Sequence, residues 1–147
     1  MIEIKCITKD NLSFVQALEE TLFSDPWGEK ALNSWFSQPG AKGYLLLEDA
    51  SPCAYVLFQS VCSEGELLRC GVLPKKKRKG LGFALLSSGL ENLKNENVNR
   101  VFLEVRSENE PAKKLYEKLG FRLLGTRKNY YQKPTDHALI YEKNLME

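Results

Sequence analysis

The sequence has a single histidine, His137, in 147 residues, and its four cysteines show no C-x-x-C spacing. A zinc site built from cysteine and histidine is therefore not indicated, and we expect no metal. Catalysis by a serine or cysteine that a histidine activates has equally little support, so we expect no catalytic role for His137. The four cysteines are Cys6, Cys53, Cys62 and Cys70, and three of them lie in apolar runs. A free thiol in such a run packs as a small apolar side chain, so we expect reduced and buried cysteines.

Long apolar runs and an excess of one charge are also absent. No apolar stretch approaches the roughly 20 residues that span a bilayer, and the N-terminus does not resemble a signal peptide, so we expect a cytoplasmic protein with no membrane partner. Lys and Arg number 21 against 19 Asp and Glu, and the net charge of +2 favours no class of partner. With 43% hydrophobic and 27% charged residues, the composition is that of a globular protein. We expect a single domain over residues 1–147, large enough to bury its own core.

Hydrophobic periodicity predicts a mixed order of strands and helices. Residues 2–7 alternate apolar and polar side chains as a half-buried strand does, and Asp10 is the expected N-cap of the helix that follows. Phe23–Trp27 interrupts that helix. Further strands are expected over 44–48, 54–61, 66–72, 101–105, 122–130 and 138–145, and further helices over 29–36, 80–95 and 111–119. This order predicts an α/β fold in which about four helices cover a mixed, largely antiparallel sheet.

A basic loop that contains glycine joins a predicted strand to a predicted helix. Its sequence is Lys77-Arg78-Lys79-Gly80-Leu81-Gly82. Glycines let backbone N–H groups approach an anion, and a helix N-terminus carries about half a positive charge, so the segment predicts a phosphate cradle. It matches neither the P-loop nor the G-x-G-x-x-G pattern. Taken alone, it could also be a solvated basic loop or a nucleic-acid-binding tract, but one local basic run does not make a nucleic-acid footprint, and we expect no direct nucleic-acid binding.

A second group of motifs follows, in the order Leu103-Glu104-Val105-Arg106, Asn109, Leu115-Tyr116-Glu117 and Gly120-Phe121. Together with the basic loop, these motifs resemble the GNAT (Gcn5-related) N-acetyltransferase superfamily, and more narrowly the RimI-like ribosomal-protein alanine N-acetyltransferases. The Q/R-x-x-G-x-G/A loop of the superfamily corresponds to residues 77–82, with Lys77 where Gln or Arg is usual. Phe23–Trp27 and Arg127–Tyr131 also resemble segments of the RimI-like enzymes.

This resemblance implies the GNAT fold, in which two neighbouring parallel strands of the sheet splay apart around acetyl-CoA. The main chain of Cys70, Gly71 and Val72 would pair with the pantetheine arm as an added strand, with the Val72 N–H on the thioester carbonyl. Asn109 would hydrogen-bond the same arm, although Glu108 stands where the family usually has a serine. The loop would bind the pyrophosphate through the N–H groups of Arg78, Lys79, Gly80, Leu81, Gly82 and Phe83.

Acetyl transfer requires a neutral amine, a polarised carbonyl and a proton or hydrogen bond for the leaving thiolate. The resemblance makes Glu104 the general base, acting directly or through a water, and Tyr116 the acid. From the residues alone, Glu104 could equally be a solvent-facing carboxylate that pairs with Arg106 on the same face of the strand. Tyr116 could be a core tyrosine of its helix. An unperturbed tyrosine protonates a thiolate at a cost of about 2 kcal/mol, so Tyr116 could also donate a hydrogen bond only.

The acceptor amine can be argued from acid–base chemistry. An α-amine titrates at about 7.7–8.0 and a lysine at about 10.4, so deprotonating a lysine costs about 3.5 kcal/mol more at neutral pH. A lone glutamate base therefore suits an N-terminal amine. The resemblance implies the N-terminal alanine of small-subunit ribosomal protein eighteen as the acceptor, flanked by Trp27, Tyr130 and Tyr131. Trp27 and Trp35 could instead pack in the core, and Tyr130-Tyr131 could be a strand pair with one ring in and one out.

Three functions follow from the sequence. The prediction is a peptide N-α-acetyltransferase that uses acetyl-CoA by direct attack in a ternary complex. The alternatives are a GNAT enzyme for another amine, whether another protein N-terminus, a lysine or a small metabolite, and a non-catalytic acyl-CoA sensor or nucleic-acid binder. The presence of Glu104, Tyr116 and Asn109 together argues against the non-catalytic alternative.

Overall fold

The structure, a computed structural model, describes residues 1–77, 79–132 and 134–146. Seven strands form one sheet in the order β1-β2-β3-β4-β5-β7-β6. The strands are β1 (Ile2–Cys6), β2 (Ala41–Glu48), β3 (Ser51–Val61), β4 (Glu64–Val72), β5 (Arg100–Arg106), β6 (Arg122–Tyr131) and β7 (Asp136–Asn144). The helices are α1 (Leu12–Leu22), α2 (Glu29–Phe36), α3 (Leu81–Asn95) and α4 (Glu110–Lys118), with a short 3-10 turn η1 (Pro74–Lys76).

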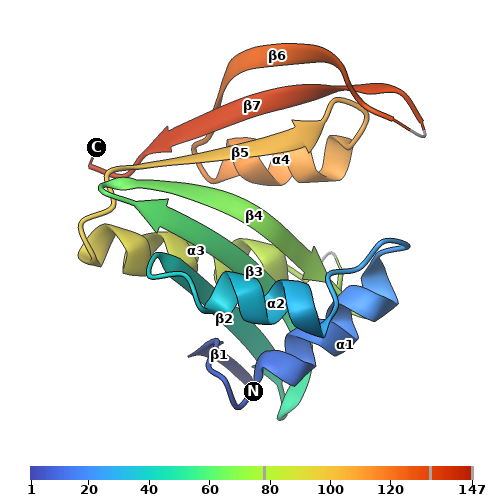
Figure 1. Cartoon of the computed structure of the whole chain (residues 1–147), viewed down its shortest axis with the longest axis vertical. Helices are drawn as coiled ribbons and strands as arrows, with labels where there is room; N and C mark the ends of the chain where they lie inside the picture. The colour runs from blue at the N-terminus through green and yellow to red at the C-terminus, as the bar shows by residue number, and fades with distance from the viewer. Residues whose placement is uncertain (78, 133, 147) are drawn as a thin grey trace.

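Helices cover both faces of the sheet (Figure 1). On the face that we call the front, α1 and α2 bury Leu18 and Leu32 against Leu57 of β3. On the back face, α3 and α4 bury a second apolar cluster that includes Leu85 and Leu103. Because side chains alternate across a strand, β2 and β3 each supply buried residues to both clusters. None of the helices in the described part of the chain has the length and apolar character that crossing a membrane requires.

The neighbours β4 and β5 run parallel, whereas the other strand pairs of the described chain are antiparallel. Their pairing covers Glu64–Glu66 against Arg100–Phe102. Immediately after this paired stretch, the register of β4 against β3 shifts, with Leu57 opposite Arg69 and Phe58 opposite Leu67. Such a bulge bends the strand that carries the extra residue. The two strands diverge from this point, as Figure 1 shows, and the predicted mixed sheet with a splayed parallel pair is confirmed.

The predicted elements are confirmed, but most of their ends differ by a few residues. The expected N-cap of α1 is wrong: Asn11, not Asp10, precedes the helix. The Asn11 side chain also does not cap the helix, since its Oδ1 accepts from the Thr8 N–H at 2.8 Å and its Nδ2 donates to the Cys6 carbonyl at 3.1 Å. These bonds close the turn between β1 and α1 instead.

The cysteines differ in burial, so the expectation that they pack inside holds only in part. Cys53 is buried and Cys70 is half-buried, whereas Cys6 and Cys62 are exposed. Cys6 lies at the end of the edge strand β1, and Cys62 lies in the tight β3–β4 turn with a φ of 57°. An edge strand and a turn both offer fewer neighbours than a central strand, which explains the exposure of these two thiols.

Candidate active site

The divergence of β4 and β5 leaves main-chain groups directed between them, in a region that we call the β4–β5 opening (67–72 and 103–106). The Leu73 N–H donates to the Cys53 carbonyl on β3 at 2.9 Å. N–H groups of successive residues point to opposite sides of a strand, so the N–H groups of Val72 and Cys70 point into the opening. Gly71, in register with Tyr55, directs its main chain toward β3. A Cβ at Gly71 would lie 2.6 Å from Leu22 Cδ1, so a side chain here would require Leu22 to shift.

Tyr116 of α4 closes the back of the opening. Its side chain is buried, with 6% of its surface exposed, and its ring packs edge-to-face on Phe121 at 5.9 Å. Its hydroxyl lies 3.4 Å from Cys70 Sγ. Burial, and to a lesser extent Cys70, raises the pKa of Tyr116 above its ordinary value. Tyr116 is thus a core residue, as one interpretation of the sequence predicts, and it also directs its hydroxyl toward β4.

The predicted phosphate loop lies at the N-terminus of α3. Gly80 precedes the helix with a φ of 75°, and a Cβ there would contact nothing within 4 Å, so the main chain is open on this side. Leu81 is buried and packs in the back cluster. Gly82 and Phe83 are half-buried, and the Phe83 ring lies 4.7 Å from Lys118 Nζ.

The residues of this loop fit an anion such as a pyrophosphate. A helix N-terminus with open N–H groups provides donors without a competing side chain. Lys79 is exposed beside it, and the predicted Arg78 lies outside the described residues. The positive end of the α3 dipole is at its N-terminus, so the dipole also favours an anion at Gly80.

Asn109 lies at the N-cap of α4 after the end of β5. Its Oδ1 accepts from the Ala112 N–H at 3.3 Å, which leaves the side-chain NH2 group without a hydrogen bond within the described chain. Glu108, which departs from the family pattern, donates its backbone N–H to Asp136 Oδ2 at 3.2 Å. The Ser107 hydroxyl donates to the same carboxylate. The loop before Asn109 is therefore tied to β7. The hydrogen bond from Ser107, followed by those from backbone N–H groups, lowers the pKa of Asp136 despite its burial.

Glu104 lies on the front face of β5, since its neighbours Leu103 and Val105 belong to the back cluster. Its Oε1 lies 3.2 Å from Nη1 of Arg127, and 31% of its side chain is exposed. The pairing with Arg106, which was the alternative to the general-base role, is not observed: Arg106 donates to the carbonyls of Pro134 at 3.0 Å and Gln132 at 3.4 Å. Arg127 lies on β6, two strands away, and reaches Glu104 across β7.

Two other groups lie within electrostatic reach of Glu104. Burial and then Glu104 raise the pKa of Glu66 above its usual range. Burial and Glu104 likewise raise the pKa of Tyr131. The front face at the start of the opening therefore holds two carboxylates on adjacent strands, with a tyrosine beside them.

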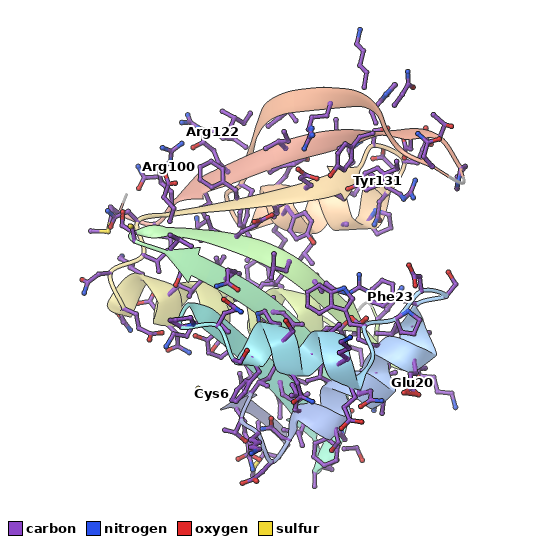
Figure 2. The ribbon with its side chains drawn as sticks, in the orientation of Figure 1. Cys6, Glu20, Phe23, Arg100, Arg122 and Tyr131 are labelled. Atoms are coloured by element: carbon purple, nitrogen blue, oxygen red, sulfur yellow. The ribbon has the colours of Figure 1, made fainter. Side chains whose placement is uncertain are left out.

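Aromatic side chains flank the front of the opening on both sides. Figure 2 shows Phe23, before α2, and Tyr131, at the end of β6, on opposite sides of the divergent strand ends. Tyr131 packs edge-to-face on Tyr130 at 5.2 Å and lies under the Arg106 guanidinium at 4.3 Å. Tyr130 is 45% exposed, so one ring of the pair is indeed more outward than the other. Trp27 is half-buried against the front cluster.

Trp35, by contrast, packs in the core as one interpretation of the sequence predicts. It is buried, and its Nε1 donates to the Phe58 carbonyl at 3.0 Å. His137 lies in the β6–β7 hairpin, where its Nδ1 accepts from the Asn129 N–H at 3.0 Å.

The sequence interpretation missed a buried carboxylate, Glu19, on the front face. Glu19 is fully buried and binds Arg69 of β4, the Tyr55 hydroxyl and the Trp27 N–H. Its position was a usable signal, because Glu19 falls four residues after Val15 and therefore on the apolar stripe of α1. A charge on such a stripe has to be paired.

The arrangement can serve a transfer between two groups that meet in the opening. A carboxylate on the front can take a proton from one reactant, and a buried hydroxyl on the back can donate a hydrogen bond to a leaving group. Between them, an N–H group of β4 that points into the opening can polarise a carbonyl.

Comparison with known proteins agrees with this arrangement. Residues 12–121 match the model of the Acetyltransferase (GNAT) family. The ribosomal protein bS18-alanine N-acetyltransferase of Escherichia coli K12 is 33% identical over 134 residues, which cover 89% of this chain and 88% of that protein. The enzyme of the same description from Salmonella typhimurium is 33% identical over 140 residues, or 93% and 92% of the two chains. The crystal structure of the ribosomal-protein-S18-alanine N-acetyltransferase from Escherichia coli superposes with a TM-score of 0.91 at 30% identity and covers 99% of this chain and 94% of that one.

Proposed function

The chain belongs to the Acetyltransferase (GNAT) family and is an N-acetyltransferase that uses acetyl-CoA, and from this premise we propose that it acetylates the α-amine of a protein N-terminus. The N-terminal alanine of ribosomal protein bS18 is the proposed acceptor. One observation carries the proposal: the opening separates a carboxylate on the front, Glu104, from the Tyr116 hydroxyl and the α3 loop on the back. The names of relatives at 33% identity support the same acceptor.

Acetyl-CoA would be held from the back of the opening. The backbone of residues 79–83 would bind its pyrophosphate, by the donors described for the α3 N-terminus. Asn109 would donate its side-chain NH2 group to the pantetheine arm, since its Oδ1 is already used. Of the three β4 residues predicted for the same arm, Cys70 and Val72 direct their N–H groups into the opening. When bound there, acetyl-CoA supplies the acetyl group as a thioester.

Glu104 would prepare the acceptor amine from the front. Its carboxylate accepts the proton of the α-ammonium group, directly or through one water, so that the nitrogen lone pair is free to attack. Arg127 contacts this carboxylate at 3.2 Å and would hold it in place for the amine. The α-amine is the group that this base can deprotonate most readily near neutral pH, because a lysine costs about 3.5 kcal/mol more.

Val72 and Tyr116 would act on the acyl group and on the leaving sulfur. The Val72 N–H donates to the carbonyl oxygen, where negative charge develops. The raised pKa of Tyr116 makes full proton donation harder than for an ordinary tyrosine. We therefore assign Tyr116 a hydrogen bond to the sulfur, while the leaving thiolate takes its proton from solvent.

Acceptor length tests this function. A hexapeptide with the N-terminal sequence of bS18, free alanine, and the same hexapeptide with a blocked N-terminus are compared at saturating acetyl-CoA. We expect kcat/KM to fall at least about a hundred-fold from the hexapeptide to free alanine, because the flanking aromatic residues would have no main chain to contact. Equal rates with free alanine would assign the enzyme to a small metabolite instead.

A further inference from the structure

We propose that the Glu19–Arg69 ion pair is a positioning device that holds the Phe23–Trp27 segment as one wall of the proposed acceptor site. The inference rests on the proposed function, since it assigns this wall to the acceptor. Neither Glu19 nor Arg69 takes part in the proposed chemistry, which is assigned to Glu104 and Tyr116.

Glu19 holds both ends of the segment. Its backbone carbonyl accepts from the Phe23 N–H at 2.9 Å, and its side-chain Oε1 accepts from the Trp27 N–H at 2.7 Å. A single buried residue therefore fixes the points at which the chain leaves α1 and enters the turn before α2. The segment between these points has no helix or strand of its own.

Arg69 connects this segment to the splayed strand. Its Nε and Nη2 donate to the two oxygens of Glu19 at 2.8 and 2.7 Å, which is the planar two-bond geometry that only arginine provides. Its guanidinium also lies 4.5 Å from the Phe23 ring and 5.3 Å from the Trp27 ring. Both contacts are of cation–π type. The wall is thus tied to β4 just beyond the bulge at which that strand leaves β5.

The pair is built for position more than for stability. The Glu19 carboxylate is fully buried and 21% of the Arg69 side chain is exposed, so both charges lose water, and this loss offsets much of their attraction. What a buried pair of this geometry provides is a unique arrangement of the groups around it. Here those groups are Phe23 and Trp27, on the front side where Glu104 also lies.

The test uses Arg69→Met, with Arg100→Met as a matched control. Arg100 also binds a buried glutamate, Glu142, at 2.8 Å and lies 4.9 Å from the Phe102 ring, but at the paired end of the two strands. For Arg69→Met we expect KM for the hexapeptide to rise about ten-fold, with KM for acetyl-CoA and kcat each within about two-fold of wild type. Arg100→Met is expected to leave all three constants unchanged. Arg69→Lys keeps the charge but cannot form the two parallel hydrogen bonds, so its KM for the hexapeptide should lie between those of wild type and Arg69→Met.

Tryptophan fluorescence gives a readout that does not depend on activity. The chain has two tryptophans, and Trp35 is 5% exposed, so acrylamide quenching reports mainly on Trp27. Arg69→Met should raise the quenching constant about two-fold or more, because Trp27 loses a ring contact and the order of its segment. Glu19→Gln, which keeps an acceptor for the Trp27 N–H, should raise it less.

The outcomes separate the two proposals. Unchanged quenching in Arg69→Met would overturn the positioning role, and so would raised quenching with an unchanged KM for the hexapeptide. An equal rise in KM in Arg100→Met would make the effect a general loss of stability, which also overturns it. If the wild type acetylates no peptide at all, the proposed function fails, while quenching still decides whether the pair holds the segment.

Discussion

Replacing Glu104 with glutamine tests the assignment of the general base. Glutamine keeps the shape of the side chain and an oxygen that can accept from Arg127, but it cannot take a proton. Because the contact with Arg127 is half exposed on the arginine side, at 52%, the exchange should lower the free energy of unfolding by no more than about 1 kcal/mol. Turnover should fall by about 10²–10⁴, the range for loss of a positioned base.

The assay follows free thiol release at saturating acetyl-CoA and hexapeptide, and calorimetry measures acetyl-CoA affinity. Affinity should be unchanged, because Glu104 faces the front and the cofactor residues lie on the back and edge of the opening. Glu66→Gln is the matched control, since Glu66 is a second carboxylate on the same face and close enough to Glu104 for its pKa to rise. Its turnover should stay within about ten-fold of wild type. Wild-type turnover in Glu104→Gln, or an equal loss in the control, would remove Glu104 from the base role.

Three further perturbations address the back of the opening and the buried pair. Tyr116→Phe should lower kcat by about ten-fold with little change in acetyl-CoA affinity, as expected for one lost hydrogen bond to the sulfur; wild-type kcat would leave Tyr116 with packing alone. Gly80→Asp should abolish acetyl-CoA binding in calorimetry, because it places a negative charge beside the phosphates. Gly80→Asn also tolerates the φ of 75° but adds no charge, so it should retain more of the binding. Equal losses in the two variants would mean that charge is not the cause. The pKa of Glu19 is lowered by Arg69, Tyr55 and Trp27, which together outweigh its burial. Its contribution to stability is present above the unfolded pKa of about 4.3 and is lost as pH falls through the lower folded pKa. Urea unfolding between about pH 5 and pH 3 should therefore show a steeper loss for wild type than for Arg69→Met, and parallel curves would contradict the shift.

The sequence was sufficient for the fold because its apolar periodicity is local. Leu12, Val15 and Leu18 share one stripe of α1 in the sequence and one apolar cluster in the structure. The turn at the start of that helix was harder to predict. Asp10 and Asn11 are both good N-cap residues. In the structure Asn11 precedes the helix, and its side chain binds the Thr8 N–H in the preceding turn instead of capping the helix.

Contacts across several strands were beyond the sequence. Arg106 is two residues from Glu104 and is its nearest partner along the chain, yet Arg127 binds Glu104 because β7 and β6 follow β5 in the sheet. That order cannot be read from local spacing. Arg106 is drawn instead to two carbonyls of the β6–β7 loop.

The Glu19–Arg69 pair shows the same limit in another form. The two residues are 50 positions apart, and nothing near Arg69 in the sequence indicates a buried partner. Glu19 could have been noticed as a charge on an apolar helix stripe, which predicts a buried partner without identifying it. The roles that the resemblance gave to Glu104, Tyr116 and Asn109 stay predictions for the experiments above.

One measurement tests the central proposal most directly. The purified protein is incubated with acetyl-CoA and a single peptide that has a free N-terminal alanine and an internal lysine, and tandem mass spectrometry then locates the acetyl group. We expect one acetyl group, on the alanine α-amine. Acetylation of the lysine, or of neither amine while acetyl-CoA still binds, would contradict the assignment of this site to protein N-termini.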